Sequence, residues 1–211
     1  MAFAAFPPAE IRPTALALNV VAAGYATWRL HAAKAIDWPL LRWLAVPSLP
    51  AALLESSVVL GGRTYLMLTG SLLLLAAVLL LARSRLDAAQ GPEVDRGHAA
   101  AIGAVTGFLS GLTGVGGGVF LAPLLIGLGW TSPRRAAGLS APFILVNSAV
   151  ALAGVTMAGQ SMAHGTALYA LFALAGAVAG TAVGLRWISQ AATRYLIAGI
   201  LALAGTRLIL A

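Results

Sequence analysis

The sequence predicts an all-α fold: a polytopic helical membrane protein with about seven transmembrane helices in two weakly similar halves, one helix being broken by glycines. Of the 211 residues, 60% are apolar and only 9% are charged, whereas soluble domains average roughly 45–50% and about 25%. The mean hydropathy is +0.93. The apolar residues fall into runs close to the roughly 20 residues that cross a hydrocarbon layer. Lipid is therefore the expected solvent.

This composition excludes a soluble enzyme, a disordered chain and a disulfide scaffold, because a soluble fold could not cover so much apolar surface. The chain has no cysteine, which removes disulfides, thiolate metal sites and cysteine redox chemistry. The three histidines lack metal-ligand spacing. The net charge of +7 does not indicate nucleic-acid binding, since the basic residues stand mostly at the ends of apolar runs. We expect no cofactor and no metal.

The predicted elements begin after an irregular lead-in, Met1 to Pro13, because proline disfavours helix at the residue before it. Helices are favoured for the runs that follow, since lipid leaves backbone polar groups no other partner. A β-barrel would need alternating strands, and Leu72–Leu81 does not alternate. The expected spans are Thr14–Leu30, Trp38–Leu60, Thr64–Ala82, Ala99–Gly129, Ala136–Ala158, Thr166–Ile188 and Ala192–Leu210.

A polar loop from Arg83 to His98 divides the chain, and it holds half of the acidic residues. The predicted organisation is a first half over residues 1–83 with about three helices, a loop over 84–98, and a second half over 99–211 with about four. The halves resemble each other weakly, since a Tyr-Leu pair opens the last span of each. Internal repeats are frequent in secondary transporters. Ala99–Gly129 has no counterpart in the first half.

The distribution of basic residues does not predict the membrane orientation. If every segment crosses once, the split between the two sides is nearly even, which has no force under the positive-inside rule. One side collects Arg12, Arg63, Arg134, Arg135, Arg186 and Arg194, and the other collects Arg29, Lys34, Arg42, Arg83, Arg85, Arg96 and Arg207.

Two glycine stripes recur at a spacing of four residues, which places each stripe on one helical face and allows another backbone to approach closely. We expect the two stripes to pack against each other. They are Gly103, Gly107 and Gly111 in the fourth span, and Gly176, Gly180 and Gly184 in the sixth.

A second glycine signal lies at the expected middle of the membrane. Gly114, Gly116, Gly117 and Gly118 predict an interruption of the helix, because each interior glycine costs about 1 kcal/mol relative to alanine. An unwound backbone survives in lipid only where protein or a water-filled cavity receives it. The helix that resumes near Pro123 would present free amides and a partial positive charge, which suits an anion. The alternative interpretation is a kink or a close-packed crossing.

The stretch Gly111-Leu112-Thr113-Gly114-Val115-Gly116-Gly117-Gly118, followed by Pro123-Leu124-Leu125, resembles the signature of the sulfite exporter TauE/SafE family. Ala136-Ala137-Gly138-Leu139-Ser140 and Asn147-Ser148 resemble that family's next helix. The resemblance implies a multi-span inner-membrane permease for sulfite, sulfonates and related organic anions, with two similar halves. Members usually carry the glycine element in both halves. This chain lacks the first copy, so either the start site is misassigned or the chain is a shorter variant.

Several polar residues are candidates for substrate contact. Ser140 and Asn147 are seven residues apart and share a helical face, and Ser110 and Thr113 flank the glycine break. Each could hydrogen-bond an oxyanion, or could instead bond a neighbouring helix. Thr14 and Asn19 are the candidate counterparts in the first half.

Charged candidates are fewer. Glu55 lies within the second expected span, where a carboxylate is costly unless paired or protonated. It could carry a coupling proton, or it could lie near the interface and bond a neighbour. Arg134 and Arg135 could draw anions to a cavity mouth, or they could serve as topology anchors.

The predicted function is therefore a membrane permease for small anions, a secondary transporter coupled to ions or protons, with the bilayer and a small anion as partners. The residues alone indicate only an anion; sulfite or an organosulfonate comes from the resemblance. A homo-oligomer is compatible with the sequence. The alternative is a non-transporting membrane subunit or assembly partner. The sequence shows no reactive constellation of the kind that an intramembrane enzyme needs. A channel would be distinguished from a transporter by non-saturable flux.

Overall fold

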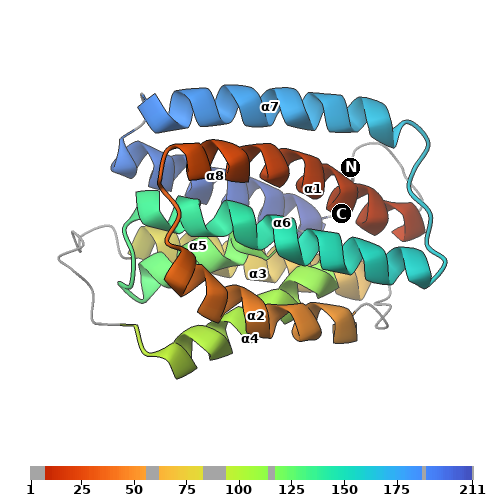
Figure 1. Cartoon of the computed structure of the whole chain (residues 1–211). Helices are drawn as coiled ribbons and strands as arrows, with labels where there is room; N and C mark the ends of the chain where they lie inside the picture. The colour runs from red at the N-terminus through yellow and green to blue at the C-terminus, as the bar shows by residue number, and fades with distance from the viewer. Residues whose placement is uncertain (1–7, 56–61, 83–93, 114–116, 187–188, 211) are drawn as a thin grey trace.

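The computed structural model describes residues 8–55, 62–82, 94–113, 117–186 and 189–210, and these ranges form eight α-helices without strands. Figure 1 shows them as a single bundle. The all-helical prediction is confirmed. The helices are α1 (Pro8–Ala32), α2 (Trp38–Glu55), α3 (Gly62–Ala82), α4 (Arg96–Thr113), α5 (Gly118–Gly127), α6 (Pro133–Met157), α7 (Thr166–Arg186) and α8 (Gln190–Leu210).

The predicted irregular lead-in is wrong from Pro8 onward, because α1 already begins there and includes Pro13. A proline at the first helical position loses nothing, since its missing N–H would have no partner there. Pro13 costs one intrahelical bond, but it is buried in the bundle. The predicted lead-in before Pro8 lies outside the described residues.

Three helices are long and apolar enough to cross a membrane by length and composition: Pro133–Met157, Thr166–Gly184 and Ala191–Leu210. Leu66–Ala82 and Gly118–Gly127 are shorter apolar helices. These lengths, together with the exposed leucines, valines and phenylalanines of the outer surface, fit a polytopic helical membrane protein, since apolar side chains face lipid without penalty.

The bundle has two ends, which can be told apart by contacts. At one end, the α1–α2 turn and the start of α6 line a common pocket, and Arg96 at the start of α4 lies over the Trp43 ring. We call this the Lys34 end. At the opposite end, the Ala163 amide of the α6–α7 loop donates to Thr14 Oγ1 at 2.8 Å.

The fourth predicted span is not a single crossing. Its helices α4 and α5 form a hairpin that enters and leaves at the Lys34 end. Val94, before α4, and Trp130, after α5, pack against one cluster with Ile36 of the α1–α2 turn. The predicted break between the two helices is confirmed, since α4 ends at Thr113 and α5 starts at Gly118. The segment does not cross as a single span because α5 has only ten residues, about 15 Å of helix, and runs back toward the end from which α4 came.

The remaining six helices form an inverted pair of triplets. Helices α1, α2 and α3 correspond to α6, α7 and α8, each with the chain running in the opposite direction. The contacts follow this correspondence. Each of α1 and α3 packs on its own counterpart, α6 and α8. The contact of α1 with α7 corresponds to the contact of α6 with α2. The α4–α5 hairpin has no counterpart, as predicted. The division into 1–83, 84–98 and 99–211 stays a prediction, since helices of both halves interleave.

The expected packing of the two glycine stripes on each other is wrong. A Cβ on Gly103 would collide with the Leu44 carbonyl, and one on Gly107 would lie 2.6 Å from Ser48 Cα. The α4 stripe therefore packs on α2. On α7, a Cβ on Gly176, Gly180 or Gly184 would meet no atom of another described element within 4 Å. Figure 1 shows α7 along one edge of the bundle beside α1, and α4 with α2 along the other.

Candidate functional site

The candidate site is the glycine break between α4 and α5. Gly117 has φ 59° and ψ −36°, and it forms the N-cap of α5 with no side-chain hydrogen bond. Its carbonyl accepts the amides of Phe120 at 2.9 Å and Leu121 at 3.0 Å. The amides of Gly118 and Val119 precede these donors, so they have no acceptor within the helix. The break thus presents backbone N–H groups at the positive end of the α5 dipole.

Glycine is required here because side chains from two other helices press on the backbone. A Cβ on Gly117 would lie 2.7 Å from Ser110 Cβ and 3.0 Å from both Ser110 Oγ and Phe143 Cε1. A Cβ on Gly118 would lie 2.7 Å from the Ser140 carbonyl oxygen and would also collide with Ile144. The backbone at Gly117 and Gly118 is therefore enclosed between α4 and α6, which is where non-helical backbone can persist in a membrane protein.

Three of the buried polar atoms without a partner lie on α4 and α6. Ser110 Oγ, Asn147 Oδ1 and Ser148 Oγ have no hydrogen-bond partner among the described residues, and all three side chains are fully buried. A buried polar group that lacks a partner costs about 1–3 kcal/mol. Such atoms therefore indicate a ligand, a water or an ion at this position.

Two predicted residues also make local bonds. Ser140 Oγ donates to the Ala136 carbonyl at 2.9 Å, which leaves its lone pairs free to accept but uses its only proton. Asn147 Nδ2 donates to the Phe143 carbonyl at 3.0 Å. This bond fixes the orientation of the amide, because the reverse orientation would face two oxygens toward each other. Asn147 thus offers an acceptor oxygen, Oδ1.

The structure brings together Ser110, Gly117, Gly118 and Ser140 among the predicted site residues. Asn147 is seven residues beyond Ser140 on α6, about 10 Å along the axis, so a small anion does not contact both. The Thr113 side chain, Gly114 and Gly116 lie outside the described residues. Sequence reasoning missed Phe143 as part of the enclosure, although its position three residues after Ser140 places it on the same face.

The remaining candidates lie elsewhere. Thr14 Oγ1 already accepts the Ala163 amide, so it holds the α6–α7 loop against α1. Asn19 lies in the middle of α1. Glu55 is the last residue of α2, one helix length from the Lys34 end, and its side chain lies outside the described part. In the described ranges, no group of three or more His, Asp or Glu side chains could hold a metal ion.

Arg134 and Arg135 lie at the start of α6, where they line a pocket of about 440 Å³ with the α1–α2 turn. Ser132 caps this helix, its Oγ accepting the Arg135 amide at 3.4 Å. An apolar cluster that includes Leu41, Leu139 and Phe143 is fully or nearly fully buried and lies deeper on the same helices. The pocket and the glycine break are therefore two separate places.

The outer end of α4 is formed by Asp95. Its Oδ2 accepts the amides of Gly97 at 3.0 Å and His98 at 3.2 Å. The hydrogen bond from the His98 backbone is the largest cause that lowers the pKa of the exposed Asp95 carboxyl. The carboxylate is the better acceptor for orphan amides at a helix start, so the cap fixes where the hairpin begins.

Comparisons with known proteins give a family and one curated relative. Residues 1–208 match the family model described as "Sulfite exporter TauE/SafE". The chain is 33% identical over 214 residues to the probable membrane transporter protein y4hK of Sinorhizobium fredii (strain NBRC 101917 / NGR234), covering 99% of this chain and 86% of the relative. No solved structure matches.

Proposed function

Because the chain belongs to the sulfite exporter TauE/SafE family and is a membrane transporter by that kinship, we propose that it is a secondary permease for small oxyanions such as sulfite or an organosulfonate. The single observation that carries the anion assignment is the glycine break. There the amides of Gly118 and Val119 have no acceptor within α5, and the buried Ser110 Oγ, which has no partner among the described residues, lies beside Gly117. Donors without acceptors are what an oxyanion needs.

The anion is held at the break by backbone and hydroxyl groups rather than by a full positive charge. A carrier must release its cargo, and an arginine in this buried place would bind too tightly and would cost energy when empty. Ser110 Oγ donates one bond, and the helix dipole of α5 adds a partial charge. Phe143 and Ile144 limit the space beside the glycines, which favours a small anion.

Asn147 and Ser148 form a second polar step on α6. The free Oδ1 of Asn147 is an acceptor, so it repels a bare anion but suits the proton of a protonated anion or a cation that travels with it. We propose that the coupling ion or proton binds at Asn147. Glu55, at the opposite end of the bundle, remains a candidate for proton entry. The sequence holds no nucleotide-binding motif, so we propose coupling to an ion or a proton rather than direct use of ATP.

We further propose a multi-pass inner-membrane protein with six crossings and one re-entrant hairpin. With this topology, eight basic residues of the described helices and turns lie at the Lys34 end: Arg29, Lys34, Arg42, Arg96, Arg134, Arg135, Arg186 and Arg194. Three lie at the opposite end: Arg12, Arg63 and Arg207. The positive-inside rule then assigns the Lys34 end to the cytoplasm.

The test is saturable sulfite uptake into proteoliposomes under an imposed proton gradient. Ser110→Ala should lower kcat/KM by about 10- to 100-fold, because hydrogen bonds to charged groups contribute about 1.5–3 kcal/mol. Ser48→Ala is the matched control: this buried serine bonds its own helix through Ala45, and its loss should leave uptake within about twofold. Equal uptake by Ser110→Ala and wild type would remove the anion from the break.

A second pair of variants tests the backbone itself. Gly118→Ala places a methyl group 2.7 Å from the Ser140 carbonyl, whereas Gly127→Ala in the same helix makes only an ordinary contact with Leu79 at 3.8 Å. Uptake should fall with the first and persist with the second. Absence of uptake by the wild-type chain for sulfite and organosulfonates alike would favour the alternative, a membrane subunit that needs a partner. The uncovered face of α7 is the observation that favours that alternative.

A further inference from the structure

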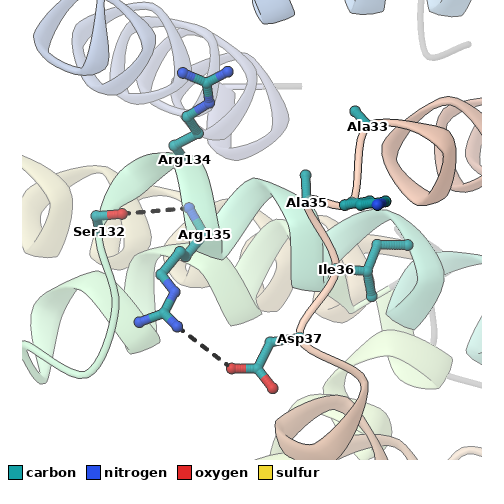
Figure 2. A pocket seen from close by; sticks show the side chains of 8 residues that line it. Ala33, Ala35, Ile36, Asp37, Ser132, Arg134 and Arg135 are labelled. Atoms are coloured by element: carbon teal, nitrogen blue, oxygen red, sulfur yellow. Dashed lines mark hydrogen bonds and ion pairs between the residues drawn. The ribbon is translucent and has the colours of Figure 1, made fainter.

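A pocket at the Lys34 end lies outside the glycine break and has a composition of its own. It has a volume of about 440 Å³ and is lined by the turn after α1 and by the first residues of α6: Ala33, Lys34, Ala35, Ile36, Asp37, Ser132, Arg134 and Arg135. Three cationic side chains and one carboxylate thus surround it. Figure 2 shows Arg135 extending toward Asp37, while Arg134 leaves the same helix turn in another direction.

The backbone at Lys34 is the unusual feature of this pocket. Lys34 has φ 52° and is the one non-glycine residue with positive φ in the described part of the chain. The amide of Lys34 donates to the His31 carbonyl at 2.9 Å and that of Ala35 to Leu30 at 3.0 Å. This is the Schellman pattern, whose left-handed residue is usually glycine.

The same cap closes two other helices of this chain, and both use glycine. At the end of α5, Gly129 donates to Ile126 and Trp130 to Leu125. At the end of α6, Gly159 donates to Thr156 and Gln160 to Val155. Both glycines have positive φ, 76° and 80°. The chain has 24 glycines, and these two caps each use one. At the end of α1, beside Arg134 and Arg135, the left-handed position is instead taken by a strained lysine.

Strain at a single residue is a reason to look for a use of its side chain. The Lys34 side chain is not needed to neutralise Asp37, the carboxylate that lines the pocket, because Asp37 already has other partners. Asp37 Oδ2 lies 3.8 Å from Arg135 Nη2, and its Oδ1 accepts the Leu40 amide at 3.2 Å as the cap of α2. In the described residues neither Lys34 nor Arg134 forms an ion pair. Two cationic groups of the pocket are thus available.

We propose that this pocket binds an oxyanion group of the sulfonate or phosphate type, held by Lys34, Arg134 and Arg135, with Asp37 competing for Arg135. The ligand is either a free oxyanion or the headgroup of an acidic lipid, since both present the same charged oxygens. If the ligand is the transported anion, the pocket is a loading station, and that part rests on the proposed function. The binding itself does not rest on it.

The pocket is distinct from the glycine break. Ser140 follows Arg134 by six residues on α6, about 9 Å along the axis. The residues that line the pocket are also different from those that press on Gly117 and Gly118. Anion binding in the pocket can therefore be measured separately from binding at the break.

The experiment is thermal unfolding in nanodiscs of zwitterionic lipid, with sulfite or inorganic phosphate against sodium chloride of equal ionic strength. It is done in a Ser110→Ala background, which removes the contribution of the break. The oxyanions should raise the midpoint of the otherwise wild-type protein. Lys34→Gly relieves the strain, so its midpoint without ligand should be higher, yet its response to the oxyanions should fall at least by half. A variant that is more stable than its parent but responds less to the oxyanions has not lost the response through misfolding.

Two further variants separate charge from strain. Lys34→Gln keeps a side chain at the strained position and should lose the response without the gain in stability. Asp37→Asn retains a cap for α2 and frees Arg135, so it should enlarge the response. An unchanged response in Lys34→Gly would overturn the proposal.

The two ligand sources are separated by lipid composition. A response in zwitterionic lipid assigns the free oxyanion. A Lys34-dependent rise that appears only when an acidic phosphoglyceride is added assigns the headgroup. If the wild type shows these Lys34-dependent responses but takes up no anion, the pocket stands and the proposed transport fails. If the protein takes up the anion but shows no Lys34-dependent response in either lipid, the proposed transport stands and the pocket proposal fails.

Discussion

The α4 and α7 glycine stripes have the same spacing but opposite surroundings. On α4, Gly103 and Gly107 allow the backbone to lie directly against Leu44 and Ser48 of α2. On α7, Gly180 and its neighbours in the stripe face no atom within 4 Å. The spacing thus provides a surface that another helix can approach, but it does not determine whether the chain supplies that helix.

The inverted repeat explains where the difference arises. Helices α2 and α7 occupy equivalent places, since α2 packs on α6 as α7 packs on α1. The α4–α5 hairpin covers α2, and no described element covers the corresponding face of α7. The asymmetry is therefore a consequence of one unrepeated element, and every prediction below tests either the hairpin or one of the two stripes.

The largest expected effect is a reversal of sidedness at the α6–α7 loop. If α4–α5 is a hairpin, Ala33 and Met162 lie on opposite sides of the membrane. If the same segment crossed once, they would lie on the same side. The chain has no cysteine, so Ala33→Cys and Met162→Cys each introduce a unique thiol at an exposed position. An impermeant maleimide added to intact cells should label Met162→Cys alone.

The outcome also tests the orientation. Labelling of both variants from outside would mean that the α4–α5 segment crosses the membrane once and is not a hairpin. Labelling of Ala33→Cys alone would keep the hairpin and reverse the assignment of the Lys34 end to the cytoplasm.

The next largest effect is expected from leucine on each stripe. Gly107→Leu puts a side chain where a Cβ alone would lie 2.5 Å from Ser48 Cβ, and overpacking typically costs about 1–3 kcal/mol and occasionally more. We expect loss of monodisperse protein in detergent. Gly180→Leu adds the same side chain to an open face and replaces an interior glycine by a good helix former, so it should not lower the unfolding midpoint.

A failure of this contrast would itself be informative. If Gly180→Leu damages the protein in membranes as much as Gly107→Leu does, the α7 face is covered there by another helix. Cross-linking through Gly180→Cys would then show whether a second copy of the chain supplies it.

Sequence reasoning reached the break because glycine density is a local property. Four glycines within five residues destabilise a helix whatever surrounds them, and Pro123 follows inside α5. It did not reach the hairpin, because the direction in which α5 leaves depends on the packing of Val94, Trp130 and Ile36, which lie far apart in sequence, against one buried cluster. For the same reason it misassigned the partner of the α4 stripe.

The candidate site divides in the same way. Ser110 and Ser140 were predictable as rare polar residues in apolar helices, and both lie at the break. Asn147 was predictable as well, but the helical rise separates it from Ser140. The strain at Lys34 was not predictable, because lysine at a helix end is ordinary in sequence; only the backbone dihedral distinguishes it.

The smallest expected effect, with opposite signs on the two stripes, comes from alanine. Gly180→Ala should raise the free energy of unfolding by about 0.5–1 kcal/mol, because glycine in a helix interior costs that much and the added methyl meets nothing. Gly107→Ala gains the same helix propensity, but its Cβ would lie 2.6 Å from Ser48 Cα and the Ser48 carbonyl oxygen. Backbone at that distance cannot yield without separating α4 from α2, so this variant should be less stable than the wild type. Chemical unfolding of both proteins in the same detergent measures the difference. Equal shifts would mean that backbone propensity outweighs packing, and the two faces would then be equivalent.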